Sequence, residues 1–97
     1  MARLIYSEEA LADLERLVDF LRESFPGSAE GALDSILAAL DLLADHPMMG
    51  RKLDRSRREL VISRGATGYL AAYRFDAARN LVRVPRIRHQ REAGYEE

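Results

Sequence analysis

Apolar residues recur at two different spacings along this chain, and the change of spacing separates predicted helices from predicted strands. After Ser7, which is placed to cap a helix, apolar residues return every three or four positions until the helix-stopping sequence Phe25-Pro26-Gly27. A second stripe of the same kind follows Ser28, another candidate cap, and ends at His46-Pro47, where we expect His46 to cap the helix end. Because only a few residues connect the two helices, they should form an antiparallel hairpin.

The first helix is predicted to be amphipathic, with one apolar side facing the core. Its acidic residues, Asp13 among them, mostly fall where we expect them to stay in water. The apolar side is made of Leu11, Leu14, Leu17, Val18, Phe20 and Leu21.

Alternation with a period of two predicts four strands, at residues 3–6, 59–63, 69–75 and 81 to about 89. In the last strand the alternation slips, since Val84 and Ile87 fall on opposite faces if the period is strict. Pro85 lies at the slip and cannot donate a hydrogen bond to a neighbouring strand, so we expect a bulge or bend there. In the third strand one predicted face carries Tyr69, Ala71, Tyr73 and Phe75, and the other carries Leu70, Ala72 and Arg74.

The resulting order, β-α-α-β-β-β, predicts the α+β class, with the helical hairpin packed on one face of a small, mainly antiparallel sheet. Ninety-seven residues suffice for a single domain, residues 1–97, with one core. We expect the opposite face of the sheet to be open to a partner. On that face the basic connector, residues 50–58, and the arginines of the last strand should converge.

The amino-acid composition argues against disulfides, bound metals and membrane segments. The chain has no cysteine and two histidines, so we expect neither a disulfide, a metal site nor a cofactor. The first residues lack the apolar core of a signal peptide, and no apolar run approaches the roughly 20 residues that span a bilayer. We therefore expect a cytoplasmic protein that does not bind membranes.

Charge is divided unevenly between the two halves of the chain. Residues 1–50 carry three basic and ten acidic residues, a net charge of -7, whereas residues 51–97 carry twelve basic and six acidic residues, a net charge of +6. One interpretation is that acidic helices neutralise a basic sheet inside one fold. The other is a surface for an anionic partner, which the dominance of arginine favours because its guanidinium suits carboxylates and phosphates. The predicted partner-binding residues are Arg51, Arg55, Arg58, Arg74, Arg86, Arg88, His89, Arg91, Glu92 and Tyr95.

Five segments together form a recognisable pattern over nearly the whole length of the chain. They are residues 8–14, His46-Pro47-Met48-Met49-Gly50-Arg51, residues 58–62, residues 68–76 and Ile87-Arg88-His89-Gln90-Arg91-Glu92. In this order they resemble the ParE/RelE toxins of bacterial type II toxin–antitoxin modules, and more closely the ParE side. The resemblance implies a toxin neutralised by a ParD-like antitoxin encoded beside it. ParE-like members poison DNA gyrase, whereas RelE-like members cut messenger RNA on the ribosome, and one fold serves both.

A ribonuclease without a metal needs a general acid, a general base and cations for the phosphate. His89 could act as acid or base, Arg74, Arg58 or Arg88 could hold the phosphate, and Tyr95 or Glu92 could complete the set. Against that interpretation, we favour for His89 a hydrogen bond at the strand end to a carboxylate such as Glu92, and Tyr95 lies six residues beyond His89.

We therefore predict a ParE-like toxin that inhibits DNA gyrase by binding rather than by catalysis. A RelE-like messenger RNA endoribonuclease is the alternative, and a non-toxic module that docks an acidic partner is a third possibility. An antitoxin segment is expected at the junction of hairpin and sheet, with its acidic residues reaching Arg51, Arg55, Arg58 or Arg74. The tail from Gln90 is expected to fold back over the sheet and contribute to the target surface.

Overall fold

Five strands form one sheet in the order β1-β5-β4-β3-β2 in the computed structural model, which describes residues 1–24, 27, 29–64 and 67–89. Strand β1 is parallel to β5, and the remaining neighbours are antiparallel. The predicted α+β fold is thereby confirmed. The elements are β1 (Arg3–Tyr6), α1 (Glu8–Ser24), α2 (Ala29–Asp41), a 3-10 turn η1 (Leu42–Ala44), β2 (Arg51–Lys52), β3 (Arg58–Arg64), β4 (Thr67–Asp76) and β5 (Leu81–His89).

The strand β2 was not predicted, because its two residues lie within the charged connector. Near the end of the second helical segment, the backbone N–H of His46 donates to the carbonyl of Leu42, so the capping bond comes from the backbone of His46. Phe25, Pro26 and the predicted cap Ser28 lie outside the described residues.

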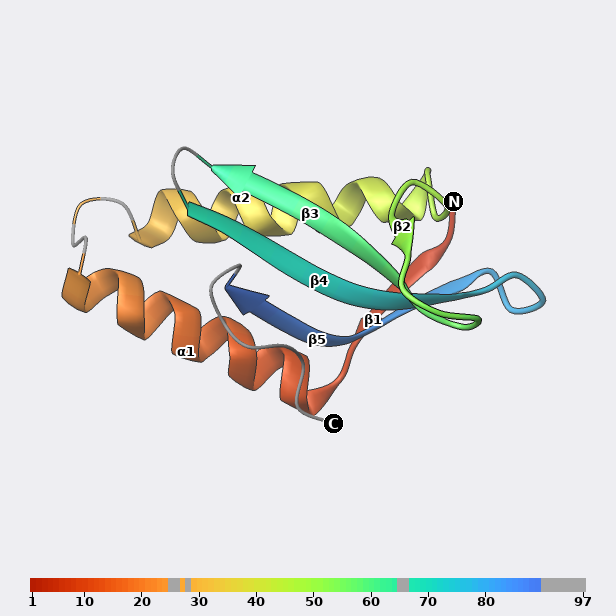
Figure 1. Ribbon diagram of the computed structural model, residues 1–97, viewed down its shortest axis with the longest axis horizontal. Coiled ribbons are helices and arrows are strands. Elements are labelled where there is room, and N and C mark those ends of the chain that lie inside the picture. Colours follow the sequence, from red (N-terminus) through yellow and green to blue (C-terminus); the bar gives the residue numbers. More distant parts are fainter. Residues whose placement is uncertain (25–26, 28, 65–66, 90–97) are drawn as a thin grey trace.

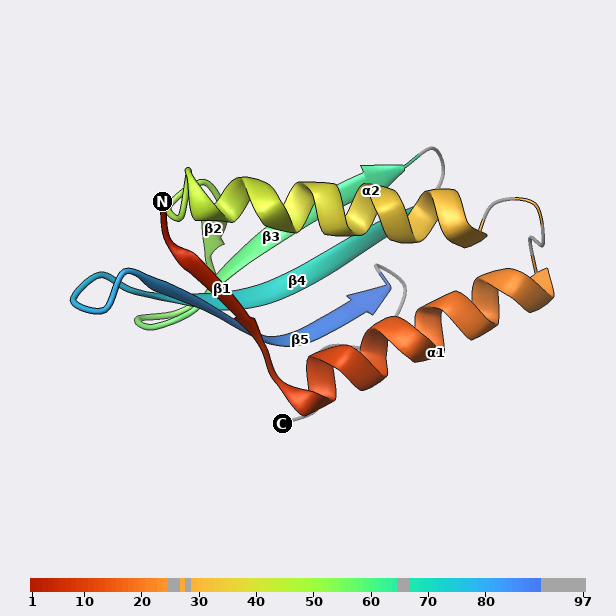
Figure 2. The same cartoon turned by 180° about the vertical axis from the view of Figure 1, so that it is seen from behind.

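Both helices lie on the same side of the sheet, α2 behind β3 and β4 and α1 along β5 (Figures 1 and 2). The predicted inner face of β4 is confirmed, since Tyr69, Ala71 and Tyr73 are buried in the core and Phe75 packs against it. The helices contribute Leu14, Leu17, Leu21, Ala32, Ile36 and Leu40 to the same core.

The first helix is turned relative to the predicted orientation. Leu11 and Phe20 were expected in the core but are about half exposed, at 50% and 52%. Asp13 was expected in water but is only 4% exposed. The buried side is therefore narrower than the apolar stripe, and it includes a carboxylate that must find partners.

The bulge predicted at Pro85 is confirmed. Ala72 pairs with Arg86 and Arg74 pairs with Arg83, so β5 advances three residues while β4 advances two. The extra residue returns Ile87 to the face of Val84, and both are buried in the core.

The predicted Ser7 cap is also confirmed, and it joins the helix to the bulge. The Ser7 hydroxyl accepts a hydrogen bond from the backbone of Ala10 at 2.9 Å and donates one to the Pro85 carbonyl at 2.7 Å. The Ser7 backbone N–H donates to the carbonyl of Val84 at 3.1 Å. The start of α1 is therefore fixed to the irregular part of β5.

Asp13 continues this attachment beyond the point where β1 stops pairing with β5. Its carboxylate accepts hydrogen bonds from the Ile87 backbone N–H at 2.9 Å and from the Arg86 Nε and Nη2 at 2.9 and 3.0 Å. Burial alone would raise the pKa of Asp13, but the hydrogen bonds from Arg86 and Ile87 and the charge of Arg86 hold that pKa below its ordinary value. The carboxylate thus takes the place of a neighbouring strand at the edge of β5.

Replacing Asp13 by alanine should lower the free energy of unfolding by about 2–3 kcal/mol, because Arg86 and the Ile87 N–H lose a buried acceptor. Urea denaturation at pH 7 measures the change. Asp19→Ala, which removes an exposed acid from the same helix, should stay within about 0.5 kcal/mol of the unsubstituted protein. Equal effects of the two substitutions would contradict the role given to Asp13.

The lowered pKa of Asp13 also predicts how stability depends on pH. Because the folded-state pKa lies below the unfolded value of about 4, the contribution of Asp13 is complete above that value and is lost as pH falls through the folded pKa. Asp13→Asn should therefore be less stable than the parent protein at pH 7, with a difference that narrows below about pH 4. Urea unfolding of both proteins between pH 7 and pH 2 tests this, and a constant difference would refute it.

Candidate partner-binding surfaces

The face of the sheet opposite the helices, called here the outer face, carries several of the predicted arginines. Strand alternation and register place Val61, Arg74, Arg83, Arg86 and Arg88 on it. Arg74 and Arg83 are exposed and Val61 is 46% exposed, while Arg86 and Arg88 are partly buried. This is the face turned toward the viewer in Figure 1.

Arg74 and Arg83 form a cross-strand pair of like charges. In the described ranges neither has an ion pair with a carboxylate. Like charges placed directly opposite each other destabilise a sheet. An anionic partner on the outer face would relieve this repulsion.

Two other predicted contact residues already bind carboxylates inside the fold. Arg86 pairs with Asp13, as described above, and only 20% of its side chain is exposed. Arg51 donates to Glu59 through its Nε at 2.9 Å and also through its Nη2. Glu59 is buried on the outer side of β3, so Arg51 compensates its charge.

Arg58 helps to fix the turn between η1 and β2. Its Nη1 donates to the carbonyls of Gly50 at 2.7 Å and Met48 at 3.2 Å. In the same turn the Tyr73 hydroxyl donates to the Pro47 carbonyl and accepts from the Gly50 N–H, each at 2.8 Å. A Cβ atom on Gly50 would lie 2.6 Å from the Tyr73 ring, so this approach requires glycine.

Burial raises the pKa of Tyr73, although the hydrogen bond from Gly50 and the charge of Arg58 act in the opposite direction. The phenol therefore keeps its proton at neutral pH and can serve as the donor to Pro47. These contacts with Tyr73 and Arg58 explain part of the residue pattern in the segment His46-Pro47-Met48-Met49-Gly50-Arg51.

Among the described residues, the groups predicted for ribonuclease chemistry are divided between the two faces of the sheet, with His89 and Arg58 on the helix side and Arg74 and Arg88 on the outer face. His89 lies opposite Tyr69 on the helix side of the sheet, with the two rings edge to face at 5.5 Å. Arg74 lies on the outer face, five residues further along β4, a separation of about 16 Å along the strand. Tyr95, Arg91 and Glu92, and with them the predicted His89–Glu92 bond and folded-back tail, lie outside the described residues.

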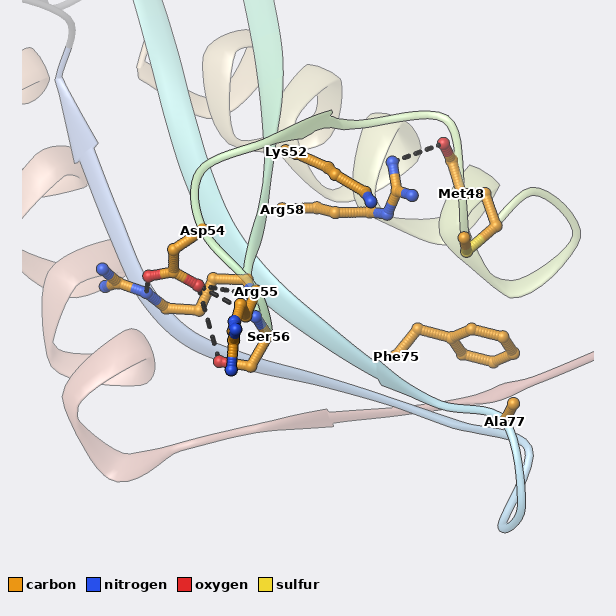
Figure 3. A pocket seen from close by; sticks show the side chains of 9 residues that line it. Met48, Lys52, Asp54, Arg55, Ser56, Arg58, Phe75 and Ala77 are labelled. Carbon is orange, nitrogen blue, oxygen red and sulfur yellow. Dashed lines mark hydrogen bonds and ion pairs between the residues drawn. The ribbon is translucent and has the colours of Figure 1, made fainter.

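A hollow of about 340 Å³ opens on the helix side, between the β2–β3 turn and the end of β4 (Figure 3). Register places Lys52 opposite Arg58, and both share the face of the core residue Tyr73. The expectation that the connector converges with the last strand's arginines on the outer face is therefore wrong for Arg55 and Arg58, which line this hollow. The lining residues are Met48, Lys52, Asp54, Arg55, Ser56, Arg57, Arg58, Phe75 and Ala77.

The β2–β3 turn is ordered by Asp54. Its Oδ1 accepts from the backbone of Ser56 at 3.0 Å and of Arg57 at 2.9 Å, and its Oδ2 accepts from the Arg57 Nε at 2.9 Å. These bonds and the charge of Arg57 lower the pKa of Asp54, with the Arg57 side chain making the largest contribution. Asp54 is thus committed to the turn and to Arg57. The charge run is visible in the sequence, but nothing in the sequence indicates that Lys52, Met48 and Phe75 are neighbours.

No three or more His, Asp or Glu side chains within the described segments are grouped so that they could hold a metal ion. Among these residues no helix combines the length and apolar character needed to cross a membrane.

Relatives place the chain in a family. Residues 4–94 match the family described as the ParE toxin of the type II toxin–antitoxin system parDE. Toxin RelE3 of Caulobacter vibrioides is 39% identical over 83 residues, which is 86% of this chain and 88% of the relative. Toxin RelE2 of the same bacterium is 34% identical over 92% of this chain and 96% of its own length.

Solved structures agree on the fold. A chain of the chromosomal ParDE system of P. aeruginosa superposes with a TM-score of 0.75 at 23% identity, covering 91% of this chain and 95% of that one. A chain of the E. coli RelBE toxin–antitoxin complex gives a TM-score of 0.58 at 17% identity over the same shares. From the extent of the family match and the identity to these relatives, this chain is a type II toxin of the ParE/RelE superfamily and belongs to its ParE toxin family.

Proposed function

We propose that this toxin acts as ParE-like toxins do, by binding and inhibiting DNA gyrase, and that a cognate ParD-like antitoxin neutralises it. The observation that carries the choice of target is the separation of Arg74 from His89 on opposite faces of the sheet. An enzyme that cleaves RNA with these two groups needs both within hydrogen-bond reach of one phosphate. Binding to a protein target requires no such convergence.

The outer face is the surface we assign to the target. Arg74 and Arg83 supply uncompensated positive charge, and the exposed Val61 adds an apolar contact on the same face. The remaining predicted residues, Arg88 on this face and Arg91, Glu92 and Tyr95 beyond it in the chain, extend the same proposal. A face that offers both charged residues and an apolar contact suits recognition by binding.

A ribonuclease is the second candidate, because the curated relatives with 34–39% identity are named RelE toxins. In that case His89 would act as general acid or base, with Arg74 and Tyr95 in the same site. The arrangement would have to bring Arg74 to the other side of the sheet, which the register of β4 opposes.

Expression of the toxin alone in a bacterium should produce broken DNA, trapped on gyrase, without new messenger RNA ends. His89→Gln keeps a donor and an acceptor but removes the titrating ring, and it should leave toxicity largely intact. A ribonuclease that depends on His89 would lose roughly 10²–10⁴-fold in rate. Mapping of DNA breaks and RNA 5′ ends after induction distinguishes the two, and loss of toxicity in a normally folded His89→Gln protein would refute the proposal.

Arg74→Ala combined with Arg83→Ala should weaken gyrase inhibition about tenfold, equivalent to about 1.4 kcal/mol, because both charges of the outer face are removed. Supercoiling by purified gyrase at a series of toxin concentrations measures it. Arg3→Ala with Arg79→Ala is the matched control, since Arg3 is exposed and Arg79 is an exposed arginine of the β4–β5 turn that forms a local ion pair with Asp76. Inhibition that stays the same in the double variant would exclude the outer face as the target surface.

A further inference from the structure

The hollow on the helix side contains a second cross-strand pair of like charges. Lys52 lies opposite Arg58 across β2 and β3, and Figure 3 shows their side chains entering the same space. Arg55 lines the hollow from the β2–β3 turn. Neither Lys52 nor Arg55 has an ion pair in the described part of the chain, and Asp54 is occupied by Arg57 and the turn. The hollow therefore holds an excess of positive charge.

This charge is held in a fixed frame. The carbonyls of Met48 and Gly50 orient Arg58, Tyr73 and Gly50 lock the turn beside it, and Asp54 orders the turn that carries Arg55. A ligand would therefore pay little to order the site, which favours binding. The frame keeps like charges together even though their repulsion costs stability.

The hollow also has an apolar component. Met48, Phe75 and Ala77 line it, with Phe75 resting on the core. Of these, Met48 is 58% exposed. Methionine side chains adapt their shape to apolar partners, and adjacent exposed apolar residues mark docking surfaces.

We propose that this hollow binds a segment of the antitoxin in which a carboxylate side chain lies next to an apolar one. The carboxylate would reach Lys52, Arg55 and Arg58, and the apolar neighbour would rest on Met48 and Phe75. A nucleic-acid backbone fits less well, because its phosphates repeat along a line, whereas these cations line a single hollow that also has an apolar side. The inference rests on the proposed function and adds a position for the antitoxin on the side of the sheet away from the target surface.

The test is the charge reversal Lys52→Glu with Arg55→Glu, compared with Arg3→Glu and Arg79→Glu. All four residues are exposed, and both double variants change the net charge by the same amount. Arg58 is left unchanged because it supports the turn. The first variant should bind the purified antitoxin roughly 100-fold more weakly, whereas the second should change less than fivefold. The neutral variant, Lys52→Gln with Arg55→Gln, should show an intermediate loss of antitoxin affinity. It replaces the charge-reversal variant in the test if that variant fails to fold.

The readouts are titration calorimetry with the antitoxin encoded beside this protein, fluorescence binding of a single-stranded RNA oligonucleotide, and toxicity in cells. We expect the hollow variant to stay toxic while co-expressed antitoxin no longer protects the cells. Affinity equal to that of the control, or a loss confined to the oligonucleotide, would overturn the inference. A toxin that binds antitoxin through the hollow but leaves gyrase unaffected would refute the proposed target and support the antitoxin site.

Discussion

The buried carboxylate of Asp13 holds the two halves of this fold together. It lies 73 residues from Arg86 and 74 from Ile87 in sequence, yet it binds both and closes the edge of β5 where β1 has turned away. Together with Ser7 it fixes α1 against the bulge at Pro85. The bulge in turn decides which residues of β5 face inward, so the positions of Ile87, Arg88 and His89 all depend on this attachment.

The strand register places two clusters of positive charge on opposite faces of the sheet. Arg74 and Arg83 oppose each other on the outer face, and Lys52 and Arg58 oppose each other beside the hollow on the helix side. Each pair places like charges at cross-strand distance, which lowers the stability of the isolated sheet. Anionic partners on both faces would compensate for that cost. We propose that the outer face serves the target and the hollow on the helix side serves the antitoxin.

Much of the fold follows from local sequence. The spacing of apolar residues predicts both helices and four of the five strands, and the slip at Pro85 predicts the bulge. The two-residue strand β2 escapes such reasoning because its pairing depends on β3 rather than on its own sequence. The burial of Asp13 likewise depends on a partner far along the chain, as does the pairing of Arg51 with Glu59.

The candidate sites were predicted less completely than the fold, because they too depend on residues that are far apart in the sequence. Residue type marks Arg58 and Arg74 as candidate cations for a partner, but only the strand register assigns them to opposite faces of the sheet. The most direct test of this division measures two affinities, for gyrase and for antitoxin, in the Arg74→Ala/Arg83→Ala variant, the Lys52→Glu/Arg55→Glu variant and their combination. Independent sites predict that each variant lowers one affinity and that the combination shows both losses without further change. A variant that weakens both partners to the same extent would contradict the division of the sheet into two binding faces.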